Sequence, residues 1–152
     1  MKLKLLSILP FALAGVFFLT SCEDDDPPTP PQKTKTELIS QGNWKFQGAT
    51  YGGTDISSQP QIACFIDNIF TVSANGTGAV DEATVVCNPS TAGPFTWNFQ
   101  NNETEIFVSK ALVTGGSNVW SVVSLNDNNL VISQTVTIPP APAALLVITF
   151  KH

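Results

Sequence analysis

The side chains in this sequence best suited to chemistry belong to three cysteines, Cys22, Cys64 and Cys87, and to a single histidine, His152. These residue types can support lipidation, disulfide formation, metal binding or proton transfer. The sequence contains no Gly-x-Ser-x-Gly elbow, phosphate-binding glycine loop or His-based metal spacing. Because His152 is the last residue and has no second histidine to work with, we expect no enzyme, no metal and no cofactor.

Asp81 and Glu82 form an internal acidic pair that could in principle share a proton or a metal ion. Neighbouring residues on a strand point to opposite faces, so the two carboxylates would not meet easily. We therefore interpret the pair as the solvated edge of a hairpin.

Cys22 follows a segment with the features of an export signal. Lys2 and Lys4 precede an apolar stretch, residues 5–19, that is short for a membrane span but typical of a signal-peptide core. Leu19-Thr20-Ser21-Cys22 resembles the lipobox of bacterial lipoproteins, in which the cysteine is lipidated and becomes the first residue after cleavage. The resemblance predicts a signal peptide over 1–21 and a membrane partner bound through acylated Cys22. An ordinary secretory signal with a chance cysteine is the alternative.

Residues 22–36 have the composition of a tether. Four acidic residues at 23–26 are followed by a proline-rich run that cannot bury apolar area. The acidic run resembles the surface-export signal of lipoproteins in Bacteroidetes, which implies an outer-membrane protein displayed at the cell surface. A solvated spacer is the alternative.

The remaining residues, 37–152, predict one small all-β domain. Charged residues make up 12% of the chain, its formal net charge is −5, and it contains no Arg, so nucleic acid is an unexpected partner. Val, Ile, Thr, Phe and Trp are frequent, and Gly, Asn and Pro separate them, as in sheets with one buried face.

Cys64 and Cys87 are expected to form a disulfide. An exported chain reaches an oxidising compartment, and two cysteines alone do not make a zinc site. If Asn75-Gly76 is a two-residue hairpin turn, facing residues have numbers that sum to 151, which pairs Cys64 with Cys87. A bulge near Asp67-Asn68 would change this register by one residue.

Eight strands are predicted between turn-forming residues. A helical turn over 36–42, with Thr36 as its possible N-cap, leads into the first strand, 43–51. The others are a strand carrying Phe70 and Val72, a return strand through Val80 to Cys87, and strands over 95–100, 106–108, 119–123, 130–137 and 144–150. Such strands close most simply as an eight-stranded antiparallel up-and-down barrel, and a β-sandwich is the alternative.

Gly42-Asn43-Trp44 resembles the Gly-x-Trp motif with which lipocalins begin their first strand. The segment 37–152, with its two cysteines and its Asn-Gly-Thr turn, resembles small lipocalin-like lipoproteins of Bacteroidetes. Two departures accompany the resemblance. Lipocalins usually place an Arg over this Trp, for which Lys151 is the basic residue available here, and their Asp-Tyr motif between middle strands is absent.

Aromatic residues on the predicted strands support two hypotheses about function. Phe95, Trp97, Phe99 and Trp120, together with Phe70 and Phe107, could line a cavity for a small apolar or amphipathic ligand near the barrel mouth. The same residues could form a solid core, and the domain would then be a structural or protein-interaction module of the cell envelope. The sequence indicates no particular protein partner.

Overall fold

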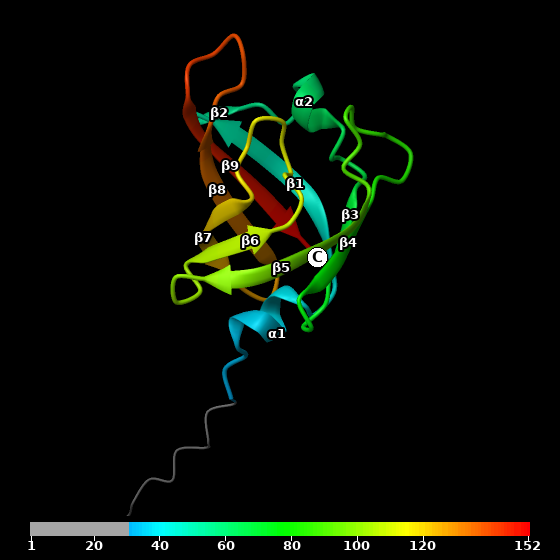
Figure 1. The fold of residues 1–152 in the computed structure, drawn as a ribbon, viewed down its shortest axis with the longest axis vertical. Helices are drawn as coiled ribbons and strands as arrows, with labels where there is room; N and C mark the ends of the chain where they lie inside the picture. Colours follow the sequence, from blue (N-terminus) through cyan, green and yellow to red (C-terminus); the bar gives the residue numbers. More distant parts are fainter. Residues whose placement is uncertain (1–30) are drawn as a thin grey trace, which may run out of the picture. The chain divides into compact units, whose positions relative to one another are not determined.

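Eight antiparallel strands form a closed barrel, which confirms the predicted fold over the sandwich (Figure 1). Each barrel strand pairs with the next along the chain, and β1 pairs with β9 to close the sheet. This computed structural model describes residues 31–152. The expected signal peptide 1–21, the lipidation site Cys22 and the tether up to residue 30 lie outside these residues.

Two short helices accompany the strands. They are α1 (Lys35–Ile39), which precedes β1, and α2 (Pro60–Ala63), which precedes β3. The barrel strands are β1 (Asn43–Tyr51), β3 (Ile69–Val72), β4 (Thr77–Asp81), β5 (Gly93–Gln100), β6 (Glu105–Val108), β7 (Val119–Leu125), β8 (Asn129–Val136) and β9 (Ala144–Lys151). A two-residue strand, β2 (Thr54–Asp55), pairs with the end of β1.

β1 has the bounds that its alternation predicts. Trp44 and Phe46 are buried, whereas Lys45 is exposed on the other face. After the strand, Gly52 and Gly53 take φ values of 57° and 84°, a conformation that favours glycine, so the chain turns there.

The turn between β3 and β4 corrects the predicted register. The Ser73 N–H donates to the Thr77 carbonyl at 2.8 Å, so residues 74–76 form a three-residue turn, with Gly76 at φ 83°. A turn followed by a left-handed glycine inserts one more residue than the predicted two-residue turn. Phe70 consequently faces Val80, not Asp81, and β4 ends at Asp81 rather than continuing to Cys87.

Helix α1 covers one end of the barrel, which we call the closed end together with the turns at 73–76, 101–104 and 126–128 (Figure 1). Its N-cap is Thr34 rather than the predicted Thr36. The Thr34 hydroxyl accepts from the Glu37 N–H, and the Glu37 carboxylate accepts from the Thr34 N–H at 2.7 Å. Glu37 therefore satisfies a backbone donor at the cap, which places the helix start two residues earlier.

Lysines bind the entering chain to the closed end. Lys33 Nζ forms an ion pair with Asp127 and donates to Gln41 Oε1 at 2.8 Å. Lys35 Nζ donates to the Glu103 carbonyl at 2.7 Å. The folded unit therefore begins before residue 37, and its first residues lie at the closed end.

Side chains fill the barrel interior. The rings of Phe70 and Phe150 meet nearly edge to face with centroids 5.0 Å apart, and the buried Phe95 and Trp97 lie on β5. Gly78 on β4 makes room for Phe95, because a Cβ at Gly78 would lie 2.3 Å from that ring. A void of about 50 Å³ remains among these residues, so the barrel is of the filled kind.

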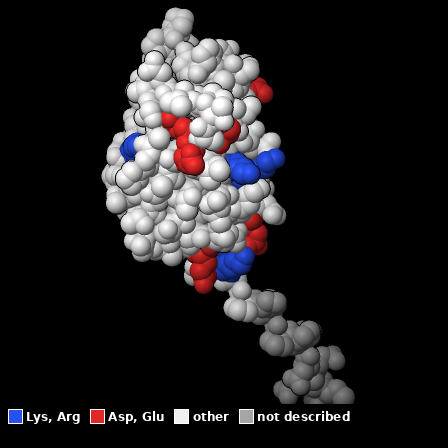
Figure 2. Space-filling model, turned by 90° about the vertical axis from the view of Figure 1, so that its right-hand side faces the viewer, with Lys and Arg blue, Asp and Glu red and all other residues white. Residues whose placement is uncertain are grey.

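Charged groups are sparse on the surface. Figure 2 shows a face that is mostly uncharged, on which the acidic and basic residues lie in a few small groups. In the part of the chain that the structure describes, no helix is long and apolar enough to cross a membrane. The charged residues on this face therefore form no extended patch of one sign.

Candidate functional site

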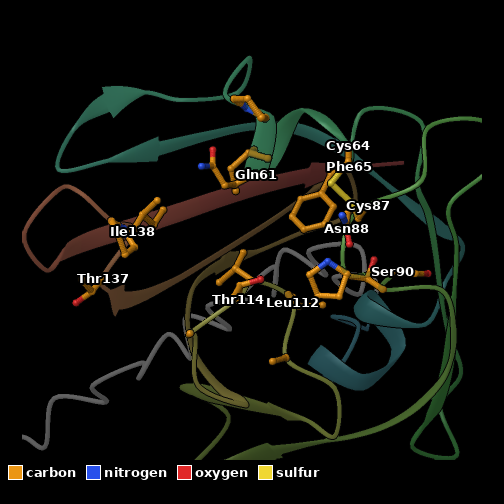
Figure 3. A pocket seen from close by; sticks show the side chains of 18 residues that line it. Gln61, Cys64, Phe65, Cys87, Asn88, Ser90, Leu112, Thr114, Thr137 and Ile138 are labelled. Atoms are coloured by element: carbon orange, nitrogen blue, oxygen red, sulfur yellow. A yellow bond between two sulfur atoms is a disulfide. The ribbon is translucent and has the colours of Figure 1, made fainter.

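A pocket of about 410 Å³ lies at the end of the barrel opposite α1, which we call the open end (Figure 3). Its walls come from α2 and from loops 82–92, 109–118 and 137–143. The apolar part of the lining includes Ile62, Phe65, Leu112 and Ile138, and the polar part includes Gln61, Asn88, Ser90, Thr91, Thr114 and Thr137. This volume falls in the range of small-molecule sites.

The disulfide between Cys64 and Cys87 joins two of these walls. The Cα atoms are 5.1 Å apart, and both residues line the pocket. Cys64 caps the end of α2, and Cys87 lies in loop 82–92, so neither belongs to a strand. The pairing is the predicted one, but the predicted reason is wrong, because the hairpin register would place Val86 opposite Cys64.

Specific bonds hold the other walls. Buried Gln134 on β8 accepts from the Ser117 N–H at 2.6 Å, which holds loop 109–118. Lys110 Nζ donates to the carbonyls of Thr91 and Ala92 and so connects that loop to loop 82–92. The Tyr51 hydroxyl accepts from the Ile138 N–H at 3.3 Å. The pocket is therefore built by residues from four separate parts of the chain.

Glu82 is buried behind the pocket wall, which corrects its interpretation as a solvated residue. Its side chain is 4% exposed and accepts from the Ser90 hydroxyl at 2.7 Å and from the Thr91 N–H and hydroxyl at 2.5 and 2.7 Å. Burial raises the pKa of this carboxyl, but the hydrogen bonds from Ser90, Thr91 and the Cys87 backbone outweigh burial and leave the pKa below its usual value. Glu82 is thus an ionised acceptor that positions two lining residues.

Glu82→Gln is expected to lower the free energy of unfolding by about 2 kcal/mol at about pH 7, because an amide cannot accept all of these bonds. A lowered pKa in the folded state stabilises the fold above the unfolded pKa, and this contribution disappears as the pH falls through the folded pKa. The difference from the wild type should therefore shrink as the pH is lowered below the ordinary carboxyl range, as measured by urea denaturation. Glu103→Gln, in an exposed turn at the closed end, is the control. A difference that stays constant with pH would contradict the assignment.

The structure places the four predicted ligand-binding aromatics away from this pocket. Phe95 and Trp97 border the small interior void, and Trp120 is fully buried in the barrel. Phe99 is half-buried, with its ring 5.4 Å from that of Trp97. Phe107 pairs with the outward-facing Asn98 and Val119 and is also half-buried. Phe95, Trp97 and Trp120 therefore belong to the core, Phe99 packs against it, and Phe107 lies on the outer face.

Trp44 of the Gly-x-Trp motif is covered by His152 rather than by Lys151. The His152 ring lies 3.8 Å from the Trp44 ring, centroid to centroid, and His152 Nδ1 is 3.0 Å from the Asn43 carbonyl oxygen. Lys151 is exposed because the alternation of β9 turns it outward after Phe150. A Cβ at Gly42 would lie 3.2 Å from His152, which gives a packing reason for glycine at this position. Trp44 Nε1 donates to the Ile39 carbonyl at 2.7 Å and joins α1 to β1.

Sequence reasoning missed the residues that build the pocket. Three of these residues form hydrogen bonds with partners 17 to 87 positions away along the chain, namely Lys110, Gln134 and Tyr51. A local signal existed for α2 alone, where Pro60 occupies the first helical turn.

Comparison with known proteins identifies one family. Residues 41–132 match the family model described as lipocalin-like domain. The matched span begins just before Gly42 and Trp44 and ends within β8. It does not include β9, the strand that closes the barrel. No curated protein matches the sequence. Within residues 31–152 there is no cluster of three His, Cys, Asp or Glu side chains that could hold a metal ion.

Proposed function

We propose that this chain, which belongs to the lipocalin-like domain family, binds a small amphipathic molecule at the open end of its barrel. The proposed function involves no catalysis. The observation that carries this proposal is the pocket of about 410 Å³ beside an interior void of about 50 Å³. A ligand would therefore bind above the filled barrel, where apolar and hydrogen-bonding side chains meet. This location replaces the aromatic site near the barrel mouth that the sequence suggested.

Binding at this pocket can be tested by filling it. Ala111 is exposed and lines the pocket, so Ala111→Trp should occupy the volume without disturbing the buried core. Titration of octanol followed by NMR amide shifts should move signals of the open-end loops in the wild type, and Ala111→Trp should weaken binding by about tenfold or more. Val123→Trp on the outer wall is the matched control. Equal affinity of the two variants would argue against the pocket.

We propose further that the domain is held at the outer membrane, facing the cell surface, by a lipid on Cys22. The support is the lipobox-like sequence before Cys22 and the acidic run after it. Cys22→Ser should move the protein from the membrane fraction to the soluble fraction, because a second anchor is not evident in the sequence. Ser21→Ala, which keeps the cysteine, should leave the protein in the membrane fraction. Retention of Cys22→Ser after a carbonate wash would contradict the assignment.

A second candidate function is protein interaction, which one cluster favours. Ile66, Val85 and Val86 are 67%, 43% and 63% exposed, next to the disulfide that joins their segments. The Asp67 carboxylate accepts from the Val85 N–H at 3.1 Å and holds these segments together. Exposed apolar groups in a cluster often mark a contact surface. Octanol binding at the neighbouring pocket would favour the first function over this one.

A further inference from the structure

The pocket lining is uncharged. Among the described residues, those that line it include no Lys, Asp, Glu or His side chain. Lys110 Nζ, a basic group beside the pocket wall, already donates to the carbonyls of Thr91 and Ala92. An anionic ligand in this pocket would therefore lose water without gaining a partner of opposite charge.

Glu82 also determines the hydrogen-bonding polarity of two hydroxyls in the wall, those of Ser90 and Thr91. An ionised carboxylate can accept hydrogen bonds but cannot donate them, whereas a hydroxyl has one proton to donate and two lone pairs. The Ser90 and Thr91 hydroxyls each donate their proton to Glu82 at 2.7 Å. Ser90 Oγ additionally accepts from the Ala92 N–H at 3.2 Å. Both hydroxyls consequently have lone pairs, and no proton, left for a ligand.

We propose that the open-end pocket selects uncharged ligands that donate hydrogen bonds, such as alcohols and primary amides, and discriminates against carboxylates, because Glu82 fixes the Ser90 and Thr91 hydroxyls as acceptors. This inference rests on the proposed function and adds the ligand class to it. An alcohol supplies the proton that these oxygens lack. The lone pairs of a carboxylate would repel the lone pairs of the two hydroxyl oxygens, and its negative charge would have no basic partner in the lining.

Three ligands of equal chain length separate the contributions. Octanol donates and is neutral, octyl methyl ether is neutral but accepts only, and octanoate is an anion that accepts only. We expect octanol to bind most tightly, the ether more weakly and octanoate weakest, with about a tenfold range between the first and the last at about pH 7. The titrations are followed by NMR amide shifts on the Cys22→Ser chain, which keeps every described residue.

Replacement of Glu82 tests the cause of this order. In Glu82→Gln the amide donates from one atom, so one wall hydroxyl can turn its proton towards the pocket. The preference for octanol over octanoate should then shrink severalfold. Glu103→Gln removes the same charge in an exposed closed-end turn and should keep the wild-type order. If Glu82→Gln fails to fold, the order of the three ligands on the wild type still decides the question.

The outcomes distinguish this inference from the proposed function. Octanoate binding in the pocket as tightly as octanol would overturn the inference and leave the proposed function standing. An ether that matches octanol would overturn the role of the acceptor hydroxyls. Binding of none of the three ligands, or shifts confined to other parts of the barrel, would overturn the proposed function and this inference with it.

Discussion

Trp97→Ala is expected to lower the free energy of unfolding by about 3 to 5 kcal/mol, the range for deleting a large aromatic side chain from a packed core. Trp97 is 6% exposed, its ring packs on Phe99, and its Nε1 donates to the carbonyls of Ser73 and Thr77 at 3.1 and 3.2 Å. Truncation would therefore open a cavity and remove one hydrogen bond from each of these carbonyls, which also accept from the Gly76 and Ser73 N–H groups. Urea denaturation monitored by circular dichroism measures the change.

Phe107→Ala is the matched control for Trp97→Ala. Phe107 lies on the neighbouring strand β6 with its side chain half-buried on the outer face, so its truncation should cost about 1 kcal/mol. If Trp97→Ala lowers the free energy of unfolding no more than the control does, the barrel interior contains a preformed cavity rather than a packed core.

Removal of the disulfide, by Cys64→Ala with Cys87→Ala, is expected to lower the free energy of unfolding by about 3 kcal/mol, because the bond closes a loop between residues 23 positions apart. It should also weaken octanol binding, since both cysteines line the pocket and the bond joins two of its walls. Urea denaturation of the wild type with and without reductant measures the first effect.

The double variant is its own control for the reductant, which should leave its stability unchanged. Thiol titration of the denatured, unreduced Cys22→Ser chain should detect no free thiol. Detection of two would rule out the Cys64–Cys87 bond.

Much of the barrel could be predicted because its strands satisfy local rules. β1 is set by alternation from Trp44 onwards and by the two glycines after Tyr51, and all of these lie within one stretch of sequence. The register of β3 and β4 could not be predicted as easily. It depends on whether the loop around Asn75 contains two or three residues, and both are common in hairpins that contain glycine.

The pocket could not be predicted because its contacts are non-local. Glu82 was expected in water because charged residues usually are, yet the chain returns eight and nine positions later to give it the Ser90 and Thr91 donors. Similarly, the cover over Trp44 depends on strand parity: β9 turns Lys151 outward, and His152, which follows the strand, lies over the Trp44 ring.

The lysine contacts make the two ends of the barrel mechanically different, because the preceding chain is attached at the closed end. Tension transmitted through the segment before residue 32 would be carried by Lys33, Lys35 and α1, at the start of β1. The pocket lies beyond the other end of that nine-residue strand, roughly 30 Å away at about 3.4 Å per residue. A change in loops 109–118 and 137–143 would therefore alter the pocket walls, while the contacts of Lys33, Lys35 and α1 stay as they are.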